Sequence, residues 1–492
     1  ALVLRVHLIR AARRSIDVQT FIFSQDDAGK LVLDELIGAA RRGVRVRVIV
    51  DQLFSLGDPT LLARLARAHA NFEIRFYNPT FDEAATQPLE FAAGILCCFS
   101  SFNQRMHNKL LLVDGAVGLA GGRNYEDRYY DWDDVFDYRD RDVLVAGPVA
   151  AAQMQASFDA FWQHHRTVPL ARLKDINRRL LAPKSPPKPW STPEFRRPGR
   201  VAALVAHATD AAYVREHFAA AAFRVGRVDY FSDSPDKTLD PDNPADQALT
   251  RHIADLLREA AREVVMQTPY LVISSEARRI FRALRKEHPG LRVIVSTNSL
   301  AATDAFYVYA LSHKYKKRYL KLGFEIHEFK PFPADAAELV ADYANLAGDG
   351  NGVARYERYG VAPVSGEGAR LGLHAKSIVI DGATSLIGSH NFDPRSDNYN
   401  TESGFILHDV AFAAALRASI LRDAAPRNAW TIARRPRPKL VERINNAIAD
   451  FSTALPLFDF WPFRYATSYE LKPGCEPMRT TDPGFYDCYE NV

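Results

Sequence analysis

The 492-residue sequence predicts an α/β protein built from two tandem α/β/α sandwich domains. Strand-like runs alternate with helical runs over residues 15–70, and a similar order of runs returns from residue 260 onward. A proline-rich segment, 181–199, stands between the two stretches. Strands that alternate with helices are typical of a largely parallel sheet with helices on its faces. The repetition indicates that this architecture occurs twice.

The elements of the first half follow one another in a regular order. Residues 15–23 (SIDVQTFIF) and 44–50 (VRVRVIV) are rich in β-branched residues and predict strands. Residues 28–43 (AGKLVLDELIGAARRG) carry apolar residues at helical spacing and end on a glycine, which predicts a helix that stops there. Residues 61–70 (LLARLARAHA) predict a further helix. This order supports a largely parallel sheet.

The second half repeats short segments of the first. The segment AARRSIDVQT (11–20) returns as AAREVVMQT (260–268), and VRVRVIVD (44–51) returns as LRVIVST (291–297). The six prolines of 181–199 are excluded from helix interiors and central strands, so this segment is interpreted as a linker. We therefore expect a first domain at 1–180, the linker at 181–199, a second domain at 200–432 and a C-terminal extension at 433–492.

Composition narrows the class of protein. No run of 18 apolar residues occurs, so no membrane-spanning helix is predicted. A net charge of +4 is too small to indicate a nucleic-acid-binding protein by itself. A helical pattern is already under way at Ala1, so we expect the natural N-terminus, with any signal peptide or anchor, to lie upstream.

Cys97 and Cys98 are expected to be buried thiols, whereas Cys475 and Cys488 leave two options open, a disulfide in an oxidising compartment or two free thiols.

One long pattern occurs twice with identical spacing. MHNKLLLVDGAVGLAGGRN covers 106–124, and LHAKSIVIDGATSLIGSHN covers 373–391. In each copy a lysine follows a histidine two residues later, and residues two apart on a strand project to the same face. We therefore expect two pairs of side chains that project together: His107 with Lys109, and His374 with Lys376.

The rest of each pattern turns the chain back on itself. Asp114 and Asp381 open Asp-Gly turns, which are typical of hairpins, so we interpret both as mainly architectural. The returning strands bring Asn124 and Asn391 back beside the first strands, and the glycines there let a ligand approach the backbone closely.

Two such sets facing each other would offer two imidazoles, two ammonium groups and two carboxamides. This complement suits a phosphodiester: the cations and amides stabilise a pentavalent phosphorane, one imidazole attacks phosphorus, and the other protonates the leaving alkoxide. The sequence has no carboxylate cluster suited to a metal, so we expect neither a metal nor a cofactor. The duplication then has a reason, because each half supplies half of one site.

The two patterns resemble the paired HKD signatures of the phospholipase D superfamily, over nearly the whole chain. The resemblance implies a pseudo-twofold fold of two packed α/β domains, an active site at their interface, a phosphohistidine intermediate and no metal. It also implies that His107 is the nucleophile and His374 the general acid. The family's phosphate-binding positions fall on Lys109, Lys376, Asn124 and Asn391.

Three further positions follow from the same resemblance. Glu402 and Asp140 match carboxylates that orient the histidines, the alternative being that both are solvated acids at strand edges. Ser389, which we place with the phosphate-binding residues, stands where the first copy has Gly122. If this serine bonds a motif aspartate or the phosphate, the first half lacks that contact.

Within the superfamily, the segments 102–115, 139–150 and 297–304 are similar to bacterial C-type cardiolipin synthases. The similarity implies a phosphatidyltransferase of the bacterial cell envelope, peripherally associated with an anionic membrane surface. Its substrates would be glycerophospholipids, with phosphatidylglycerol first and phosphatidylethanolamine as a second candidate. Two alternatives stay open, a phospholipase D hydrolase that releases phosphatidic acid, and a phosphodiesterase or nuclease of the same superfamily. We expect no nucleic-acid partner, and the sequence does not determine the oligomeric state.

Two segments are candidates for contact with a membrane. Residues 312–323 (SHKYKKRYLKLG) either form a solvated helix face or bind anionic headgroups. Their basic residues are Lys314, Lys316, Lys317, Arg318 and Lys321. Residues 455–465 (LPLFDFWPFRY) either insert at a membrane interface or pack on the domain.

Overall fold

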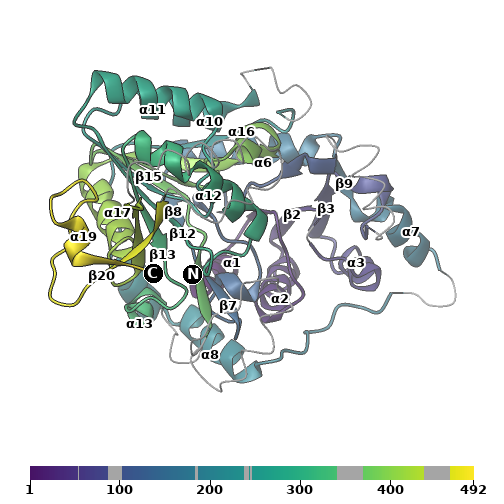
Figure 1. The fold of residues 1–492 in the computed structure, drawn as a ribbon. Helices are drawn as coiled ribbons and strands as arrows, with labels where there is room; N and C mark the ends of the chain where they lie inside the picture. Colours follow the sequence, from purple (N-terminus) through teal and green to yellow (C-terminus); the bar gives the residue numbers. More distant parts are fainter. Residues whose placement is uncertain are drawn as a thin grey trace.

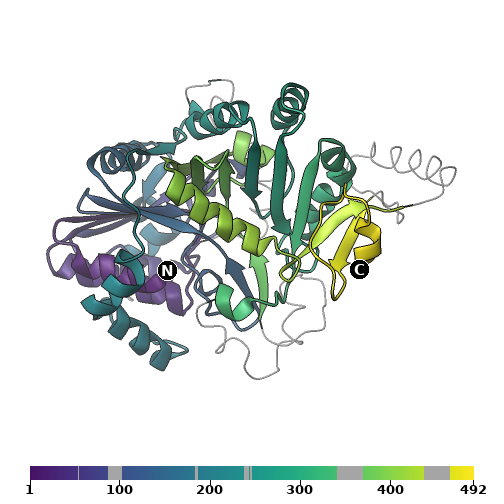
Figure 2. The same ribbon diagram turned by 90° about the vertical axis from the view of Figure 1, so that its left-hand side faces the viewer.

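The computed structural model has the predicted α/β architecture, with one large sheet in each half of the chain and helices on both faces of each sheet (Figure 1). The structure describes all residues except 54, 87–101, 183–186, 238–242, 244–245, 341–368 and 437–465. The two halves lie side by side, the first in purple to blue and the second in green (Figure 2).

The first sheet has seven strands in the order β8-β6-β5-β1-β2-β3-β9. The neighbours β1, β2 and β3 are parallel, as the alternation of strands and helices predicted, and the other strands join antiparallel. The strands are β1 (Ser15–Thr20), β2 (Arg45–Asp51), β3 (Phe72–Tyr77), β5 (Leu110–Val113), β6 (Val117–Gly121), β8 (Asp142–Ala146) and β9 (Thr167–Pro169).

Helices bury the apolar side chains of this sheet on both faces. One face carries α1 (Leu2–Ala11), α2 (Asp27–Arg41), α3 (Pro59–Leu65) and α7 (Lys174–Leu180), and the other carries α6 (Pro148–Gln163). The bounds of α2 follow from its sequence. The Asp26 side chain caps its start by accepting a hydrogen bond from the Gly29 N–H, and Gly43, just after its end, has a φ of 95° that favours glycine.

The second sheet has ten strands in the order β10-β18-β16-β15-β11-β12-β13-β19-β20-β21. Its neighbours β11, β12 and β13 are parallel and repeat the arrangement of β1, β2 and β3. The strands are β10 (Val228–Ser232), β11 (Glu263–Gln267), β12 (Arg292–Asn298), β13 (Phe324–Phe329), β15 (Ser377–Ile380), β16 (Thr384–Gly388), β18 (Ser403–His408), β19 (Ala429–Arg434), β20 (Ala466–Leu471) and β21 (Tyr489–Asn491). One face carries α10 (Ala248–Arg258), α11 (Ser275–Glu287) and α12 (Phe306–Lys321), and the other carries α17 (Val410–Asp423).

Two small sheets join the halves directly. Each pairs a short strand of the first half in parallel with one of the second: β4 (Arg105–Met106) with β17 (Asn400–Thr401), and β7 (Phe136–Arg139) with β14 (Arg370–Leu373). The residues that follow the carboxyl ends of these four short strands lie at the centre of the candidate site. The remaining short elements are η1 (Thr80–Asp82), η2 (Asp127–Tyr129), η3 (Leu170–Arg172), α9 (Ala211–Val214), η4 (Arg215–Ala219), α13 (Ala336–Leu339), α16 (Pro394–Asn398) and α19 (Phe485–Cys488).

The described part of the linker packs on the first domain. Trp190 is buried, and its indole N–H donates to Asp34 Oδ1 at 2.9 Å. Helix α8 (Pro198–Thr209) then buries Val201 and Leu204 in the first core. Residues 200–209, which the sequence analysis assigned to the second domain, therefore belong with the first, because their apolar face is complementary to α1.

The C-terminal extension continues the second sheet. Strand β20 pairs with β19, and β21 pairs with β20, so the chain after residue 433 adds strands to the existing edge.

Cys475 and Cys488 form a disulfide with Cα atoms 5.6 Å apart, which decides between the two options left by the sequence. Cys97 and Cys98 lie outside the described residues. Within the part of the chain that is described, no helix combines the length and the apolar character needed to cross a membrane.

Candidate active site

The two cross-domain strand pairs bring each motif histidine beside an acid of the other half. In the pairing of β4 with β17, the next residues along the two strands are His107 and Glu402. In the pairing of β7 with β14, they are Asp140 and His374. Because residues in register on parallel strands are neighbours, this pairing fixes which acid meets which histidine.

Each histidine is hydrogen-bonded to its acid. His107 Nδ1 lies 2.8 Å from Glu402 Oε2, and His374 Nδ1 lies 2.6 Å from Asp140 Oδ2. A carboxylate on Nδ1 keeps the proton on that nitrogen, which leaves Nε2 available to react. All four side chains are buried, so the alternative that the two acids are solvated at strand edges is wrong.

Burial lowers the pKa of both histidines. For His107 it does so to about 3, although the charge of Glu402 opposes the change. For His374, burial and the neighbouring Lys376 lower the pKa, and the charge of Asp140 opposes them. Burial acts in the opposite sense on the two acids, but the contacting histidines hold the pKa of Glu402 and Asp140 well below its usual range. At neutral pH both imidazoles of the free protein are therefore neutral, and each is hydrogen-bonded to an ionised carboxylate.

The two motif lysines lie against the histidines. Lys109 Nζ donates to the His107 carbonyl oxygen at 2.7 Å, and Lys376 Nζ lies 2.8 Å from His374 Nδ1. Burial lowers the pKa of Lys109 to about 7 and that of Lys376 to about 8. A phosphate anion beside these lysines would favour their charged forms, so an anionic ligand and the protonated lysines stabilise each other.

The pH dependence of catalysis should follow from these groups. The lysines lose their protons as pH rises through about 7 to 8, so kcat/KM, which reports the free enzyme, is expected to fall over that range. Because the pKa of His107 is lowered to about 3, the acid limb should lie well below the ordinary imidazole value. A profile of kcat/KM from pH 4 to 10 on a soluble short-chain phospholipid would check this. An acid limb near pH ~6.5 with an alkaline limb above pH ~9, as for unperturbed groups, would contradict it.

The two asparagines are placed differently. Asn124 Oδ1 accepts from the Ile22 N–H at 3.1 Å, and its Nδ2 donates to the Tyr129 hydroxyl at 2.8 Å. Asn391 Oδ1 is buried and has no hydrogen-bond partner. An unpaired buried carbonyl oxygen is costly, so Asn391 is the asparagine with free capacity toward a ligand.

The difference between Gly122 and Ser389 has a structural explanation. The Ser389 hydroxyl donates to Glu402 Oε2 at 2.5 Å, so it bonds the acid that holds His107. A Cβ at Gly122 would lie 2.2 Å from Asp140 Oδ1, which means that the Asp140 carboxylate occupies the space a serine would fill. Ser389 therefore contacts an acid, though not an aspartate of the motif, and this distinguishes the His107 side from the His374 side.

Asp114 and Asp381 lie away from the histidines, in the hairpin turns. Both take positive φ values, 54° and 51°. Asp114 Oδ1 accepts from the Arg14 and Ser15 N–H groups, and Asp381 Oδ1 accepts equivalent bonds from Arg262 and Glu263, at the starts of β1 and β11. They tie each hairpin to the neighbouring strand, as their architectural interpretation requires.

A tyrosine cluster that no sequence pattern indicated lies beside His374. The rings of Tyr129 and Tyr138 lie 5.2 and 4.9 Å from the His374 ring. Asp304 accepts hydrogen bonds from the hydroxyls of Tyr138, at 2.8 Å, and Tyr270, at 2.9 Å. Beside His107 the structure describes a ring contact of a different kind, with Phe21 at 5.0 Å. Asp304 ends the segment 297–304, which the sequence had already set apart, but no periodicity indicated that it reaches the site.

A buried ion pair between Asp233 and Lys237 contacts the backbone of Glu402. Asp233 Oδ2 accepts from the Glu402 N–H at 3.0 Å and lies 2.6 Å from Lys237 Nζ. Lys237 also donates to the Ser396 carbonyl oxygen at 2.7 Å. Neither residue belongs to a repeated motif, so only their convergence in space indicates a role in holding Glu402.

Among the residues that the structure describes, no group of three or more His, Cys, Asp or Glu side chains is arranged to hold a metal ion. The cations of the candidate site are instead those of Lys109 and Lys376.

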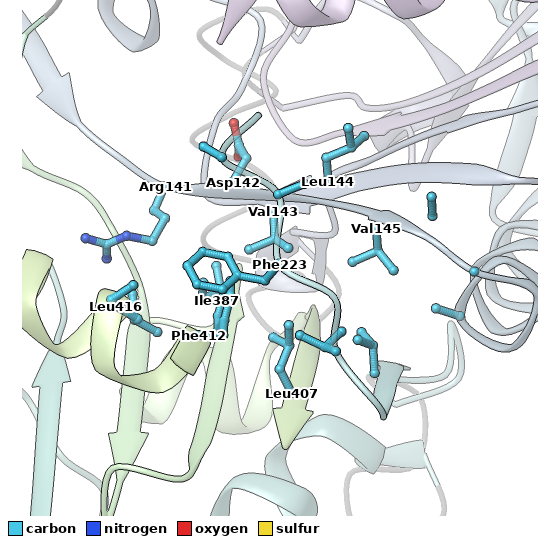
Figure 3. A pocket seen from close by; sticks show the side chains of 18 of the residues that line it. Arg141, Asp142, Val143, Leu144, Val145, Phe223, Ile387, Leu407, Phe412 and Leu416 are labelled. Carbon is cyan, nitrogen blue, oxygen red and sulfur yellow. The ribbon is translucent and has the colours of Figure 1, made fainter. Parts of the chain in front are cut away.

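A separate apolar cavity of about 620 Å³ lies between the two halves (Figure 3). It is lined by side chains of β8 and by residues of the second half such as Leu407, Phe412 and Leu416. Arg141 lies at its border and donates to Gln267 and Ser377. None of the motif histidines, lysines or asparagines lines this cavity, so it is not the reaction site.

The basic segment 312–323 lies on α12 and is not a uniform surface. Lys316 is buried, and its Nζ lies 2.6 Å from Glu328 Oε1, so it cannot bind a headgroup. Arg318 lies over the Tyr315 ring at 5.2 Å. The interpretation of the segment as one headgroup-binding face is therefore wrong for Lys316. The aromatic segment 455–465 lies outside the described residues.

Known proteins resemble this chain in sequence and in fold. A family model described as "Cardiolipin synthase, PLD-like domain" matches residues 6–162 and 349–424. Cardiolipin synthase C of Escherichia coli is 30% identical over 414 residues, which are 83% of this chain and 79% of that protein. Cardiolipin synthase B of Salmonella typhimurium is 23% identical over 84% of this chain and 75% of its own length. The crystal structure of phosphatidylserine synthase from Haemophilus influenzae has a TM-score of 0.54 at 14% identity and covers 92% of this chain and 91% of its own, which shows a shared fold.

Proposed function

This chain belongs to the phospholipase D superfamily and is a phosphatidyltransferase, and we propose that it makes cardiolipin by moving a phosphatidyl group from one glycerophospholipid to another. The observation that carries the proposal is the crossed pairing of His107 with Glu402 and of His374 with Asp140, which joins both HKD motifs in one buried site. Two of the relatives described above are cardiolipin synthases, which supports this assignment.

In the first step, His107 Nε2 attacks the phosphorus of the donor lipid. The bond from phosphorus to the headgroup oxygen breaks as the P–N bond forms, and His374 gives its Nε2 proton to the departing alkoxide. His107 suits the attack because burial keeps it neutral. His374 can give this proton only when it is protonated: burial and Lys376 lower its pKa in the free protein, the charges of Asp140 and Asp304 oppose that change, and the phosphate of a bound lipid would oppose it further.

Between the steps, the phosphatidyl group is held on His107. Lys109 and Lys376 compensate the charge that builds up on the phosphoryl oxygens. The unpaired Asn391 Oδ1 can only accept a hydrogen bond, so it suits a hydroxyl of a bound lipid rather than a phosphoryl oxygen, whereas Asn124, bonded to Ile22 and Tyr129, positions the adjoining backbone. Glu402 and Asp140 keep the two imidazoles in their reactive tautomer, and Ser389 positions Glu402.

In the second step, a hydroxyl of the acceptor lipid attacks the phosphohistidine while His374 removes its proton. The P–N bond breaks and a new phosphodiester forms, so no oxidant or further reactant is needed. Water competes for the same intermediate. Transfer prevails if the site holds the lipid alcohol in line, and effective molarities of about 10⁵ M or more for well-oriented groups make this feasible.

The location of the protein is part of the proposal. A disulfide between Cys475 and Cys488 supports an oxidising compartment, as found in parts of the bacterial cell envelope. We place the protein there as a peripheral enzyme on an anionic membrane surface, with phosphatidylglycerol as the first substrate and phosphatidylethanolamine as the second candidate.

Product analysis tests the proposal directly. Incubation with labelled phosphatidylglycerol in EDTA should yield labelled cardiolipin, because lysines rather than a metal stabilise the phosphorane. Denaturation at alkaline pH, which preserves the acid-labile P–N bond of a phosphohistidine, should trap label on the wild-type protein but not on His107→Asn. Phosphatidic acid as the sole product at saturating acceptor would identify a hydrolase, and turnover of single-stranded DNA instead of lipid would identify a nuclease. Activity that EDTA abolishes and a metal restores would contradict the proposed chemistry.

A further inference from the structure

The exposed large apolar side chains of the described residues include two separated groups. One lies at the start of α12 and just before it, where Phe306 is 50% exposed and Tyr307 74% exposed, with Leu300 nearby in sequence. The other includes Val149, which lines the apolar cavity and is 60% exposed, and Val410, the first residue of α17, which is 67% exposed. Aromatic side chains in water are costly unless a partner covers them, so the position of each group relative to the active site matters.

The segment that leads into α12 forms a wall of the site. Asn298, the last residue of β12, exchanges two hydrogen bonds with the backbone of Leu373, the residue before His374. Six residues later, Asp304 binds Tyr138, whose ring contacts the His374 ring. Phe306 and Tyr307 follow two and three residues after Asp304, and a chain spans at most about 3.6 Å per residue, so their backbone lies within about 11 Å of Asp304 on the His374 side, a position that we call the rim of the site.

Val410, in the second group, lies at the other end of the second sheet from the motif side chains. The motif side chains gather at the carboxyl ends of the parallel strands, because Ser377, next to Lys376, pairs with Gln267 at the end of β11. Val410 instead follows Asp409, whose N–H bonds to Ala383 in the hairpin turn at the amino end of β11. The two groups of apolar side chains therefore face in different directions, and only the first can reach a surface that the active site also reaches.

Helix α12 separates its aromatic start from its basic end. At a rise of about 1.5 Å per residue, Lys321 lies roughly 20 Å along the axis from Phe306. Arg318 and Lys321 are thus far from the rim, and Lys316 is paired inside the protein. If the enzyme contacts a lipid surface with its active site, the aromatic first turn of the helix meets that surface and the basic last turn does not.

We propose that Phe306 and Tyr307 insert into the interfacial region of a phospholipid membrane and so place the mouth of the active site on the headgroup layer. The proposal rests on the proposed function, which requires a lipid to reach His107 and His374. Tyrosine suits this position because its ring is apolar and its hydroxyl can stay among the headgroups. Docking of this kind is driven by aromatic burial, so it should persist in high salt, unlike binding by surface lysines.

The test compares two matched double variants. Phe306→Ser with Tyr307→Ser removes the rim aromatics, and Val149→Ser with Val410→Ser removes equally exposed apolar side chains at the far end. We expect the first variant to bind phosphatidylglycerol–phosphatidylcholine vesicles about tenfold more weakly in 0.5 M NaCl, with activity on vesicles reduced in parallel. Its activity on monomeric short-chain phosphatidylglycerol and its melting temperature should match those of the wild type, and the control variant should match the wild type throughout.

The depth to which residue 307 inserts into the membrane provides an independent test. A Tyr307→Trp variant should show additional fluorescence that brominated lipids quench, relative to the wild-type protein with its five tryptophans. Unchanged vesicle binding by the rim variant, loss of binding in the control, or no added quenching would each overturn the docking site. Failure of the proposed function would appear differently, as a wild-type protein that binds vesicles but does not turn over monomeric phosphatidylglycerol.

Discussion

Replacement of His107 or His374 by alanine is expected to lower turnover by about 10²–10⁴-fold in each case, because each removes a group that transfers a proton or attacks phosphorus. The two losses should differ in kind. His107→Ala removes the nucleophile, whereas His374→Ala removes the acid that protonates the departing alkoxide.

A substrate with a good leaving group separates these roles. A p-nitrophenyl phosphodiester needs little protonation as it leaves, so it should restore much of the first step in His374→Ala and none of it in His107→Ala. Release of p-nitrophenol, measured as a burst, reports that step. His327→Ala, which removes a histidine of β13 outside the site, is the matched control and should retain activity. More than a tenth of wild-type turnover in either motif variant on natural lipid would show that the two-histidine site is wrong.

Replacement of Lys316 by methionine is expected to lower the free energy of unfolding by about 3–5 kcal/mol, the cost of leaving one member of a buried ion pair alone. Lys316 and Glu328 are both almost completely buried, with Nζ and Oε1 2.6 Å apart. The lysine also donates to the Tyr309 hydroxyl at 3.0 Å, so its loss leaves two polar groups without this partner.

Lys321, an exposed lysine of the same helix, provides the control. Lys321→Met should change stability by less than about 0.5 kcal/mol, as is usual for surface substitutions. Urea unfolding followed by circular dichroism gives both values, and Lys316→Met combined with Glu328→Gln should recover part of the loss because no unpaired charge remains. A Lys316→Met protein as stable as the wild type would mean that the pair contributes nothing and that Lys316 is available at the surface.

Local patterns were sufficient for much of the architecture. The expected strands at 15–23 and 44–50 correspond to β1 and β2, and the helix at 28–43 corresponds to α2. These elements depend on β-branched content, helical spacing and capping, which are properties of neighbouring residues. The Asp-Gly turns were predictable for the same reason, since Asp and Gly tolerate the positive φ that such a hairpin requires.

Domain boundaries were less predictable because they depend on packing. The described residues between 181 and 197 are neither helix nor central strand, and Pro198 begins α8, but the prolines did not indicate that Trp190 would be buried against the first domain. Helix α8 and the strands after residue 433 likewise take their places from complementary apolar faces and from an open sheet edge. Neither feature leaves a periodic signal in the sequence.

By itself, the sequence determined the α/β class, the duplication, and the identity of the histidines, lysines and asparagines, because the repeated motif lists them at fixed spacing. Only the tertiary structure decided that His107 meets Glu402, 295 residues away, and that His374 meets Asp140. It also decided that Lys316 is paired inside the protein and that Phe306 and Tyr307, at the start of α12, are exposed. The physical reason is that these outcomes depend on the parallel pairing of short strands from different halves and on the burial of charge between packed elements, which link residues far apart in the chain.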